Sequence, residues 1–456
     1  MLKKNDLISL KIEDMTNLGF GVAKHLGLVV FVSGAVTGEE ILAKVIKVTS
    51  SYAVCRVEKL ISPSPIRVND RCNIEKCSSC AYKSISYGEE CRIKKKSVEE
   101  AFKKAGLSNP KIAELVPSPK SCGYRNKAQY PVTRDANRRY VIGYYAPKSH
   151  RVCEARYCPL TPRVFGEICD VIAKYAEKHG ISTYDEESGS GLLRHIYIRR
   201  GEVSGEILVT LVVTENAIPN SDELICSLTE KFPEIVGILL NVNPKRTNII
   251  LSENYKTLYG VDYIYDTLSG VKLKIKAGAF YQVNHDSCEL LYAKTRELAS
   301  LEKSDTLLDL YCGIGSIGLS MAKDAGELFG VEVVRDAVDC ARENAAQAGI
   351  ENASFFAASA DDTDGLLADV EKRLSRKVKP DVIILDPPRS GCGEKAVRYV
   401  ASLSPKRIVY ISCNPTTLAR DVKLFCDMGY SFGELTPFDL FPGTGHVESV
   451  VCLTRE

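Results

Sequence analysis

The chain has 456 residues, too many for one ordinary hydrophobic core, and at ~100 to 200 residues per domain this length predicts about three domains. Its hydrophobic share of 45% and charged share of 26% are ordinary for a globular protein, which excludes wholesale disorder and a membrane-embedded protein. The net charge of +2 excludes a positive field over the whole surface, so a nucleic-acid partner would need local basic patches.

The N-terminal residues 1–61 predict a small β-barrel. Five short runs of strand-forming residues are separated by turn residues, at positions 7–12, 19–24, 28–32, 39–48 and 53–60. Asp6 lies inside what would be the apolar stretch of a signal peptide, and no run reaches the roughly 18 apolar residues that span a bilayer. We therefore expect a cytoplasmic protein without membrane contact, and we expect it to be a monomer.

The next segment, residues 62–275, predicts an α+β central domain. Helical spacing over residues 87–107 places several lysines on one face or end, which is either a basic binding surface or a solvated helix face: Lys94, Lys95, Lys96, Lys103 and Lys104. Further along, strand patterns such as IYIRR, EILVTLVV and IVGILLNV surround one helical stretch near residues 163–178.

The last segment, residues 276–456, alternates apolar strands with helical stretches. The strands TLLDLY, LFGVEVV, DVIILD and RIVYIS each precede a helix-like run. This alternation is typical of a parallel sheet with crossover helices. The whole chain therefore predicts a multidomain α/β protein whose third domain is Rossmann-like.

A ligand site is predicted where the first of these strands ends. Gly313 and Gly315 allow a sharp turn into a helix, and Glu332, at the end of the next strand, could take both hydroxyls of a ribose. With Gly318, the glycines also satisfy G-x-G-x-x-G, so they cannot separate a dinucleotide site or a plain tight turn from a methyl-donor site. Asp309 and the DPPR sequence at 386–389 favour a class I S-adenosylmethionine fold.

Cys413, in VYISCNPTTLARD, follows a buried-looking strand at the sheet edge that holds ligands in open α/β folds. Such a thiol is either a core residue or a nucleophile. A thiol that adds to C6 of uracil makes C5 nucleophilic, and a base must then remove the C5 proton. Glu448, in GTGHVESV, is the candidate base because its strand-like surroundings indicate partial burial, although a surface role stays open.

A cysteine cluster follows the predicted barrel. The chain has 17 cysteines, an odd number without an export signal, so metal or catalytic roles are favoured over disulfides. Cys72, Cys77 and Cys80 have the spacing C-x4-C-x2-C, which suits an iron-sulfur cluster with a distant fourth thiolate. Cys158 is our choice for that ligand and Cys153 the rival. Structural zinc and simple reduced thiols are the alternatives.

Together these residues resemble the RNA uracil-C5 methyltransferases, most closely the bacterial 23S ribosomal RNA members that carry a TRAM domain and a 4Fe-4S cluster. The similarity covers nearly the whole chain and rests on YRNKAQYPV, LRHIYIRRG, FYQVNHD, YISCNP and GHVESV. It implies that the N-terminal barrel is a TRAM (OB-like) domain, that the helix at about 89–107 packs on the catalytic domain, and that residues 276–456 form the methyltransferase domain. A DNA cytosine-C5 methyltransferase is disfavoured because its Pro-Cys motif is absent.

The resemblance also implies roles for single residues. It makes Cys413 the nucleophile and Glu448 the base, and it makes Cys72, Cys77, Cys80 and Cys158 the cluster ligands. The implied contacts to S-adenosylmethionine are Gln282, Tyr311, Gly313, Ser316, Glu332 and Asp386. The implied partner is 23S ribosomal RNA. A transfer-RNA uracil-C5 methyltransferase and a non-catalytic RNA-binding iron-sulfur protein are the alternatives.

RNA contacts are expected in the central domain. Bound RNA would need cations for its phosphates and aromatic faces for an unpaired base. The candidates for phosphate contacts are Arg125, Lys127, Arg194, Arg199 and Arg200, and those for stacking are Tyr124 and Tyr130.

Overall fold

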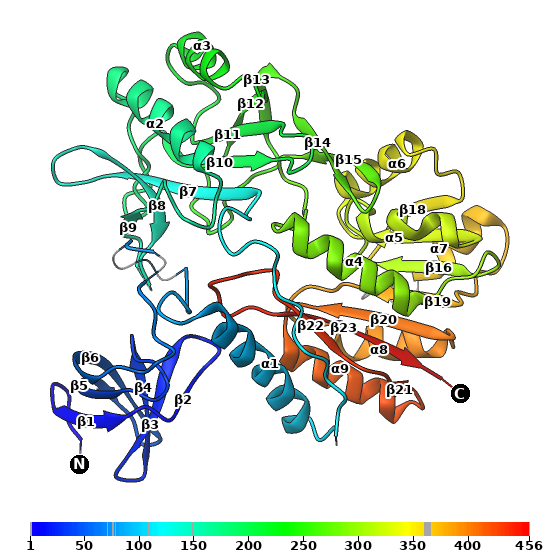
Figure 1. Cartoon of the computed structure of the whole chain (residues 1–456). Coiled ribbons are helices and arrows are strands. Elements are labelled where there is room, and N and C mark those ends of the chain that lie inside the picture. The colour runs from blue at the N-terminus through cyan, green and yellow to red at the C-terminus, as the bar shows by residue number, and fades with distance from the viewer. Residues whose placement is uncertain are drawn as a thin grey trace.

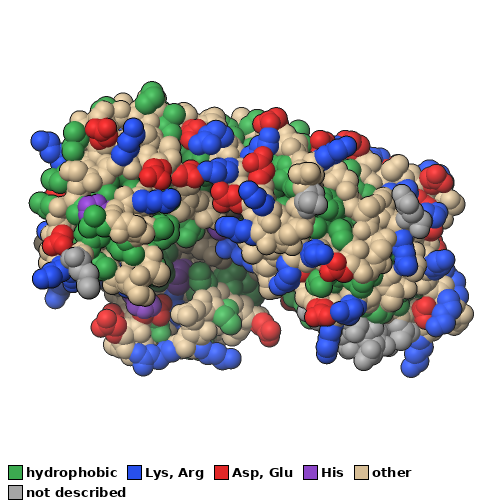
Figure 2. Space-filling view, turned by 90° about the horizontal axis from the view of Figure 1, so that it is seen from below, with side chains coloured by type: hydrophobic (Ala, Val, Ile, Leu, Met, Phe, Trp, Pro, Cys, Tyr) green, Lys and Arg blue, Asp and Glu red, His purple; other side chains and the backbone are tan. Residues whose placement is uncertain are grey.

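In the part of the chain that the structure describes, three large sheets and one β-hairpin form the fold (Figure 1). The computed structural model describes residues 2–70, 72–74, 77, 79–107, 109–147, 149–359 and 366–455. Within these ranges, no helix is both long and apolar enough to cross a membrane. Side chains of both charge signs are interspersed over the face shown in Figure 2, which agrees with the small net charge.

The N-terminal sheet has six strands in the order β1-β5-β6-β4-β3-β2. They are β1 (Leu7–Lys11), β2 (Asp14–Met15), β3 (Phe20–His25), β4 (Leu28–Ser33), β5 (Glu40–Val48) and β6 (Tyr52–Ser62). Alternate residues of β5 are buried, as a strand with one face on a core requires. The two outer strands, β1 and β2, are consecutive in the chain, and the Ile12 amide bonds to Glu39 while the Glu13 amide bonds to Val22. The sheet therefore closes into a barrel. The five predicted strands are confirmed, and β2 was not predicted.

The central sheet has seven strands, in the order β13-β12-β11-β10-β7-β8-β9. They are β7 (Lys127–Arg134), β8 (Tyr140–Tyr145), β9 (Val152–Glu154), β10 (Leu193–Arg200), β11 (Ile207–Val213), β12 (Ile235–Val242) and β13 (Tyr255–Gly260). The predicted helix α2 (Arg163–Lys178) and an unpredicted one, α3 (Ser221–Lys231), pack on it through apolar residues such as Phe165 and Leu224. The hairpin of β14 (Tyr263–Leu268) and β15 (Val271–Lys276) shares a core with the central sheet and with the C-terminal sheet, so it joins the two units.

The C-terminal sheet has eight strands, with the order β18-β17-β16-β19-β20-β23-β21 and β22 paired to β23. They are β16 (Thr306–Leu310), β17 (Glu327–Glu332), β18 (Ala353–Ala357), β19 (Val382–Leu385), β20 (Arg407–Ser412), β21 (Ser431–Phe432), β22 (Thr436–Phe438) and β23 (Glu448–Thr454). Its helices are α4 (His285–Ala299), α5 (Ser316–Met321), α6 (Arg335–Gln347), α7 (Leu366–Leu374), α8 (Gly393–Ser402) and α9 (Pro415–Asp427). The strand order reverses between β16 and β19, and open α/β sheets bind ligands at such a switch point.

Helix α1 (Tyr87–Lys104) lies against α9, far from it in sequence (Figure 1). Its apolar residues Val98 and Phe102 belong to the same core as Leu418 of α9. The expectation that Lys94 contributes to an exposed basic face is wrong. Its ammonium group is fully buried and pairs with Glu90 (2.8 Å) and Asp439 (2.7 Å), because the helix presents this side to the C-terminal segment and not to solvent.

Candidate active site

The carboxyl ends of the parallel strands surround one cavity of about 640 Å³. Because β16, β17, β19 and β20 all run in the same direction, the residues that follow them meet at this edge. Nearly all the predicted site residues line the cavity: Gln282, Tyr311, Gly313, Glu332, Asp386, Cys413 and Glu448. The structure thus gathers residues that are spread over more than a third of the chain.

Ser316 lies outside this set. It is the first residue of α5, and its hydroxyl shares a hydrogen bond of 2.7 Å with the hydroxyl of the buried Tyr292 of α4. Its side chain therefore supports the packing of two helices, and its predicted contact with a cofactor stays a prediction.

One side of the cavity is formed by the turn between β16 and α5. The Glu332 carboxylate accepts hydrogen bonds from the Gly313 amide (3.1 Å) and the Val334 amide (2.9 Å), so it holds the turn against the end of β17. Asp309 is buried beneath the turn and accepts from the Gly318 amide at 2.9 Å. Burial raises the pKa of Asp309 to about 8. Asp309 thus supports the turn from below and does not line the cavity.

The opposite side brings Cys413 and Glu448 next to each other. Cys413 follows β20 and Glu448 begins β23, and these antiparallel strands pair Ser412 with Ser449. Residues 413 and 448 therefore take the next opposed positions on neighbouring strands. Burial, with the nearby Asp386 charge as the second cause, raises the pKa of Glu448 to about 8. Burial also raises the pKa of Cys413 to about 11, followed by the effect of the Glu448 charge.

Two further polar side chains adjoin the thiol, and they were quoted only as parts of motifs in the sequence. Arg389 of the DPPR turn donates a hydrogen bond of 3.0 Å to Nε2 of His446. Burial, with the Arg389 charge second, lowers the pKa of His446 to about 4, so this imidazole is neutral and can accept that bond. Arg389 also opposes the rise in the pKa of Cys413. No single motif showed that these two side chains would meet.

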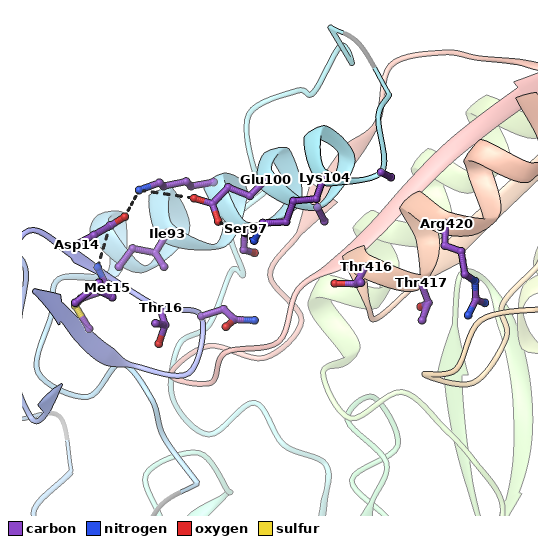
Figure 3. A pocket seen from close by; sticks show the side chains of 15 residues that line it. Asp14, Met15, Thr16, Ile93, Ser97, Glu100, Lys104, Thr416, Thr417 and Arg420 are labelled. Atoms are coloured by element: carbon purple, nitrogen blue, oxygen red, sulfur yellow. Dashed lines mark hydrogen bonds and ion pairs between the residues drawn. The ribbon is translucent and has the colours of Figure 1, made fainter. Parts of the chain in front are cut away.

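Cys413 also borders a second hollow, of about 350 Å³, on the side of the N-terminal barrel. Its walls come from the barrel turn at Asn17 and Leu18, from Arg389 and from His446. A groove of about 640 Å³ continues from it between the barrel, α1 and the first turn of α9 (Figure 3). The thiol thus lies between the cavity beside the glycine turn and the hollow on the side of the barrel.

Comparison with known proteins identifies the family. The family model described as tRNA (Uracil-5-)-methyltransferase matches residues 86–456. The chain belongs to this family. An uncharacterized RNA methyltransferase of Bacillus cereus is 38% identical over 457 residues, covering 100% of this chain and 98% of the relative. Another from Halalkalibacterium halodurans is 37% identical over 459 residues, covering 99% of this chain and 98% of the relative.

A solved structure shares the fold of this family member over almost its whole length. It is the Pyrococcus abyssi tRNA (uracil-54, C5)-methyltransferase in complex with S-adenosyl-L-homocysteine, with a TM-score of 0.79 and 26% identity. The match covers 98% of this chain and 99% of that one. The chain therefore has the same mixed α/β architecture as a methyltransferase of known structure.

The predicted cluster cysteines of this methyltransferase lie near one another. Cys80 and Cys158 share a small apolar cluster, and the pKa of Cys80 is raised to about 12 by burial and then by the charges of Cys158, Cys72 and Cys77. Burial raises the pKa of Cys158 to about 11. Among the residues that the structure describes, no three His, Cys, Asp or Glu side chains are already arranged as a metal site. The four thiols have the right chemistry for a thiophilic metal, but they do not form a closed coordination shell.

Several of the expected RNA contacts are wrong. Arg194 and Arg199 are almost fully buried and donate to main-chain carbonyls, those of Asn243 and Ala279 among them. Both arginines come from β10, whose two faces are covered, so their charges are not available to RNA. Tyr130 is a core residue of the central sheet, and the hydroxyl of the buried Tyr124 donates to the Pro442 carbonyl at 3.0 Å. Arg125, Lys127 and Arg200 are partly exposed and stay candidates.

Proposed function

We propose that this chain transfers a methyl group from S-adenosylmethionine to C5 of a uridine in RNA. The observation that carries the proposal is the place of Cys413, which borders both the cavity at the glycine turn and the barrel-side hollow, with Glu448 on the adjacent strand. Family membership supports the reaction type, and the Pyrococcus relative was solved with S-adenosyl-L-homocysteine, the product form of that methyl donor.

The cavity beside the turn offers groups suited to the methyl donor. Glu332 would accept hydrogen bonds from the ribose hydroxyls, and Gln282, Tyr311, Gly313 and Asp386 would line the rest of the molecule. When bound, the donor supplies an electrophilic methyl group. The walls formed by these residues would direct it toward the space beside Cys413.

On the RNA side, the thiolate of Cys413, formed when the thiol loses its proton to water, would add to C6 of uracil and form an S–C6 bond as the C5–C6 double bond opens. The electron pair that the ring gains makes C5 nucleophilic, so C5 would bond to the donor's methyl carbon as the bond between that carbon and the donor's sulfur breaks. Glu448 would then take the C5 proton, and the S–C6 bond would break as the ring regains its double bond. Because the pKa of Glu448 is about 8, its carboxylate form is the minor one at neutral pH, and this step should speed up toward that pH.

We infer that the RNA is 23S ribosomal RNA, with transfer RNA as the alternative, because the cluster-type cysteine spacing resembles that of the family members that act on ribosomal RNA. The N-terminal barrel would serve as a TRAM-like binding domain over residues 1–61, followed by a central domain over 62–275 and the catalytic domain over 276–456. The family description and the Pyrococcus relative favour transfer RNA, and the match to that relative spans the barrel as well. The barrel therefore does not separate the two substrates. Mapping 5-methyluridine in both RNAs from cells with and without the gene decides between them.

We also propose that Cys72, Cys77, Cys80 and Cys158 hold a 4Fe-4S cluster, with structural zinc as the alternative. The support is the mutual proximity of the thiols and the C-x4-C-x2-C spacing. Protein purified without oxygen should contain iron and acid-labile sulfide, and Cys80→Ser should lose both. Cys122→Ser, at an exposed neighbouring cysteine, is the matched control. Stoichiometric zinc without iron in the wild-type protein would establish the alternative.

The catalytic proposal is tested with two variants. Cys413→Ala should bind S-adenosylmethionine normally and methylate no RNA, because the thiol is needed only for the ring. Glu448→Gln should accumulate a covalent protein–RNA adduct, seen as a shifted band on a denaturing gel. Cys426→Ala, at a half-buried thiol on α9, should retain activity. Methyl transfer by Cys413→Ala would contradict the proposed mechanism.

A further inference from the structure

A turn of the barrel places an exposed apolar side chain at the barrel-side hollow that Cys413 borders. Leu18, in the turn between β2 and β3, is 68% exposed and lines the same hollow as Cys413. The rest of that wall is mostly polar, with Asn414 and His446 among its residues. A single exposed leucine is ordinary on a protein surface, so its position alone would carry no conclusion.

The turn itself is held rigidly. The Thr16 hydroxyl accepts hydrogen bonds from the amides of Leu18 (3.3 Å) and Phe20 (3.1 Å), and the Thr16 carbonyl accepts from the Gly19 amide (3.0 Å). These bonds close the turn at the base of Leu18. The side chain is therefore presented to solvent by an ordered backbone.

Two other parts of the chain clamp this turn from outside. A Cβ at Gly445 would lie 1.8 Å from the Asn17 carbonyl oxygen, so the segment that leads to Glu448 touches the turn with no room for a side chain. A Cβ at Gly19 would lie 2.3 Å from the Ala81 carbonyl oxygen, so the segment that follows Cys80 (the cysteine segment) also contacts the turn with no room for a side chain. Leu18 thus has a fixed place relative to Cys413, although it belongs to another domain.

The groove that leads to the hollow passes this turn. Asn17 and Ser97 line both the groove and the hollow, so the two spaces adjoin there. Figure 3 shows Thr16 of the barrel facing Thr416 and Thr417 of α9 across the groove. An RNA strand that lay in the groove and placed a base at Cys413 would pass the turn that carries Leu18.

We propose that Leu18 is a wedge that enters the base stack when the target uridine leaves it. This inference rests on the proposed function, since it deepens how the RNA reaches the thiol. A uridine in structured RNA must leave its stack before C6 can meet a sulfur, and the gap it leaves exposes apolar base faces to water. Proteins that unstack bases insert apolar side chains such as leucine into such gaps. Leu18 has the chemistry and the fixed position for this task.

The test compares two RNAs with the same target sequence. One is a hairpin containing the mapped methylation site, and the other is the single strand that remains when the complementary arm is deleted. The ratio of kcat/KM on the hairpin to kcat/KM on the single strand should fall about tenfold in Leu18→Ala, equivalent to ~1.4 kcal/mol. Leu18→Met should restore the ratio, because a flexible apolar side chain fills the same gap.

Leu26→Ala is the matched control. Leu26 is 87% exposed in the same barrel, in the turn between β3 and β4 at the other end of β3. It should leave the ratio at the wild-type value. An unchanged ratio in Leu18→Ala, or an equal loss in Leu26→Ala, would overturn the wedge.

A binding measurement separates failure of the wedge from failure of the proposed function. The same hairpin with 2-aminopurine beside the target uridine should brighten when saturated with the wild-type protein, and much less with Leu18→Ala. If the purified protein does not methylate this hairpin but the Leu18-dependent brightening persists, the methyl-transfer proposal fails and the wedge stands. Equal brightening with both proteins rejects the wedge whether or not methyl transfer occurs.

Discussion

Replacing Lys94 with Met should destabilise the contact between α1 and the C-terminal segment by about 3 to 5 kcal/mol. The Lys94 ammonium donates to Glu90 (2.8 Å), to Asp439 (2.7 Å) and to the Phe441 carbonyl (3.1 Å). The side chains of all three charged residues are 0% exposed. Methionine matches the length of lysine but leaves two buried carboxylates without their shared cation.

The magnitude follows from what those carboxylates must then do. A carboxyl group with an ordinary pKa of about 4 costs ~4 kcal/mol to protonate at pH 7, and keeping both groups charged without a cation would cost more. In the variant, the folded state raises the pKa of at least one carboxyl above its unfolded value. The folded state then holds more protons, so the variant loses stability as pH rises. Its deficit should therefore shrink by up to ~1.4 kcal/mol per pH unit between pH 7 and pH 5.

Urea unfolding measures this deficit. The chain has no Trp, so circular dichroism and the fluorescence of its 22 Tyr residues are the signals. Lys95→Met is the control because Lys95, the next residue of the helix, pairs with Glu114, which is 89% exposed. Such a surface ion pair contributes ~1 kcal/mol or less to the free energy of unfolding. Equal losses in the two variants, or a Lys94→Met deficit that does not shrink at pH 5, would refute this reasoning.

Three further predictions concern the cavity and the barrel. Glu448→Gln should lower the pKa of Cys413, because it removes a neighbouring negative charge. Alkylation of Cys413 by iodoacetamide at pH 8, followed by mass spectrometry, should then be several-fold faster than in the wild-type protein. The exposed Cys122 is the internal reference. Glu332→Gln should weaken S-adenosylmethionine binding about tenfold, measured by calorimetry, because a charged hydrogen-bond acceptor is lost. Glu327→Gln, at the other end of β17, should leave the binding affinity unchanged. Gly445→Ala should detach the barrel turn, because the new methyl group would collide with the Asn17 carbonyl. Limited proteolysis should then cut near residue 17 faster than in the wild-type protein. An unaltered cleavage rate would contradict the contact between Gly445 and the turn.

The sequence was informative where function depends on local pattern. The strands ended within two residues of the predicted positions, so the residues at or just beyond their ends, such as Glu332, Asp386 and Cys413, lie at one sheet edge. An alternation of strands and helices is enough to predict this, because parallel strands place their carboxyl ends together. The pairing of Ser412 with Ser449 was not predictable, since strand register depends on contacts between distant segments.

The same limit explains the wrong expectations. Lys94 was expected to be exposed because helical periodicity predicts which face of a helix a side chain lies on, but not what packs against that face. Its partner Asp439 is 345 residues away in sequence. Arg199 looked like a phosphate ligand because a cation in a strand gives no sign that main-chain carbonyls near residue 279 will surround it. Local pattern therefore predicted the elements, while burial of charge had to be read from tertiary contacts.

One short segment connects these observations. Between β22 and Glu448, the chain meets α1 through Asp439, and the Gly443 amide donates to Glu90 while the Gly443 carbonyl accepts from the Tyr82 amide. Two residues later, Gly445 touches the barrel turn. The proposed base is thus positioned by a helix, the cysteine segment and the barrel together, all outside the C-terminal sheet. Disturbing any of these contacts should shift Glu448 at one wall of the cavity and leave the glycine turn and Glu332 in place, so methyl transfer should be lost before cofactor binding.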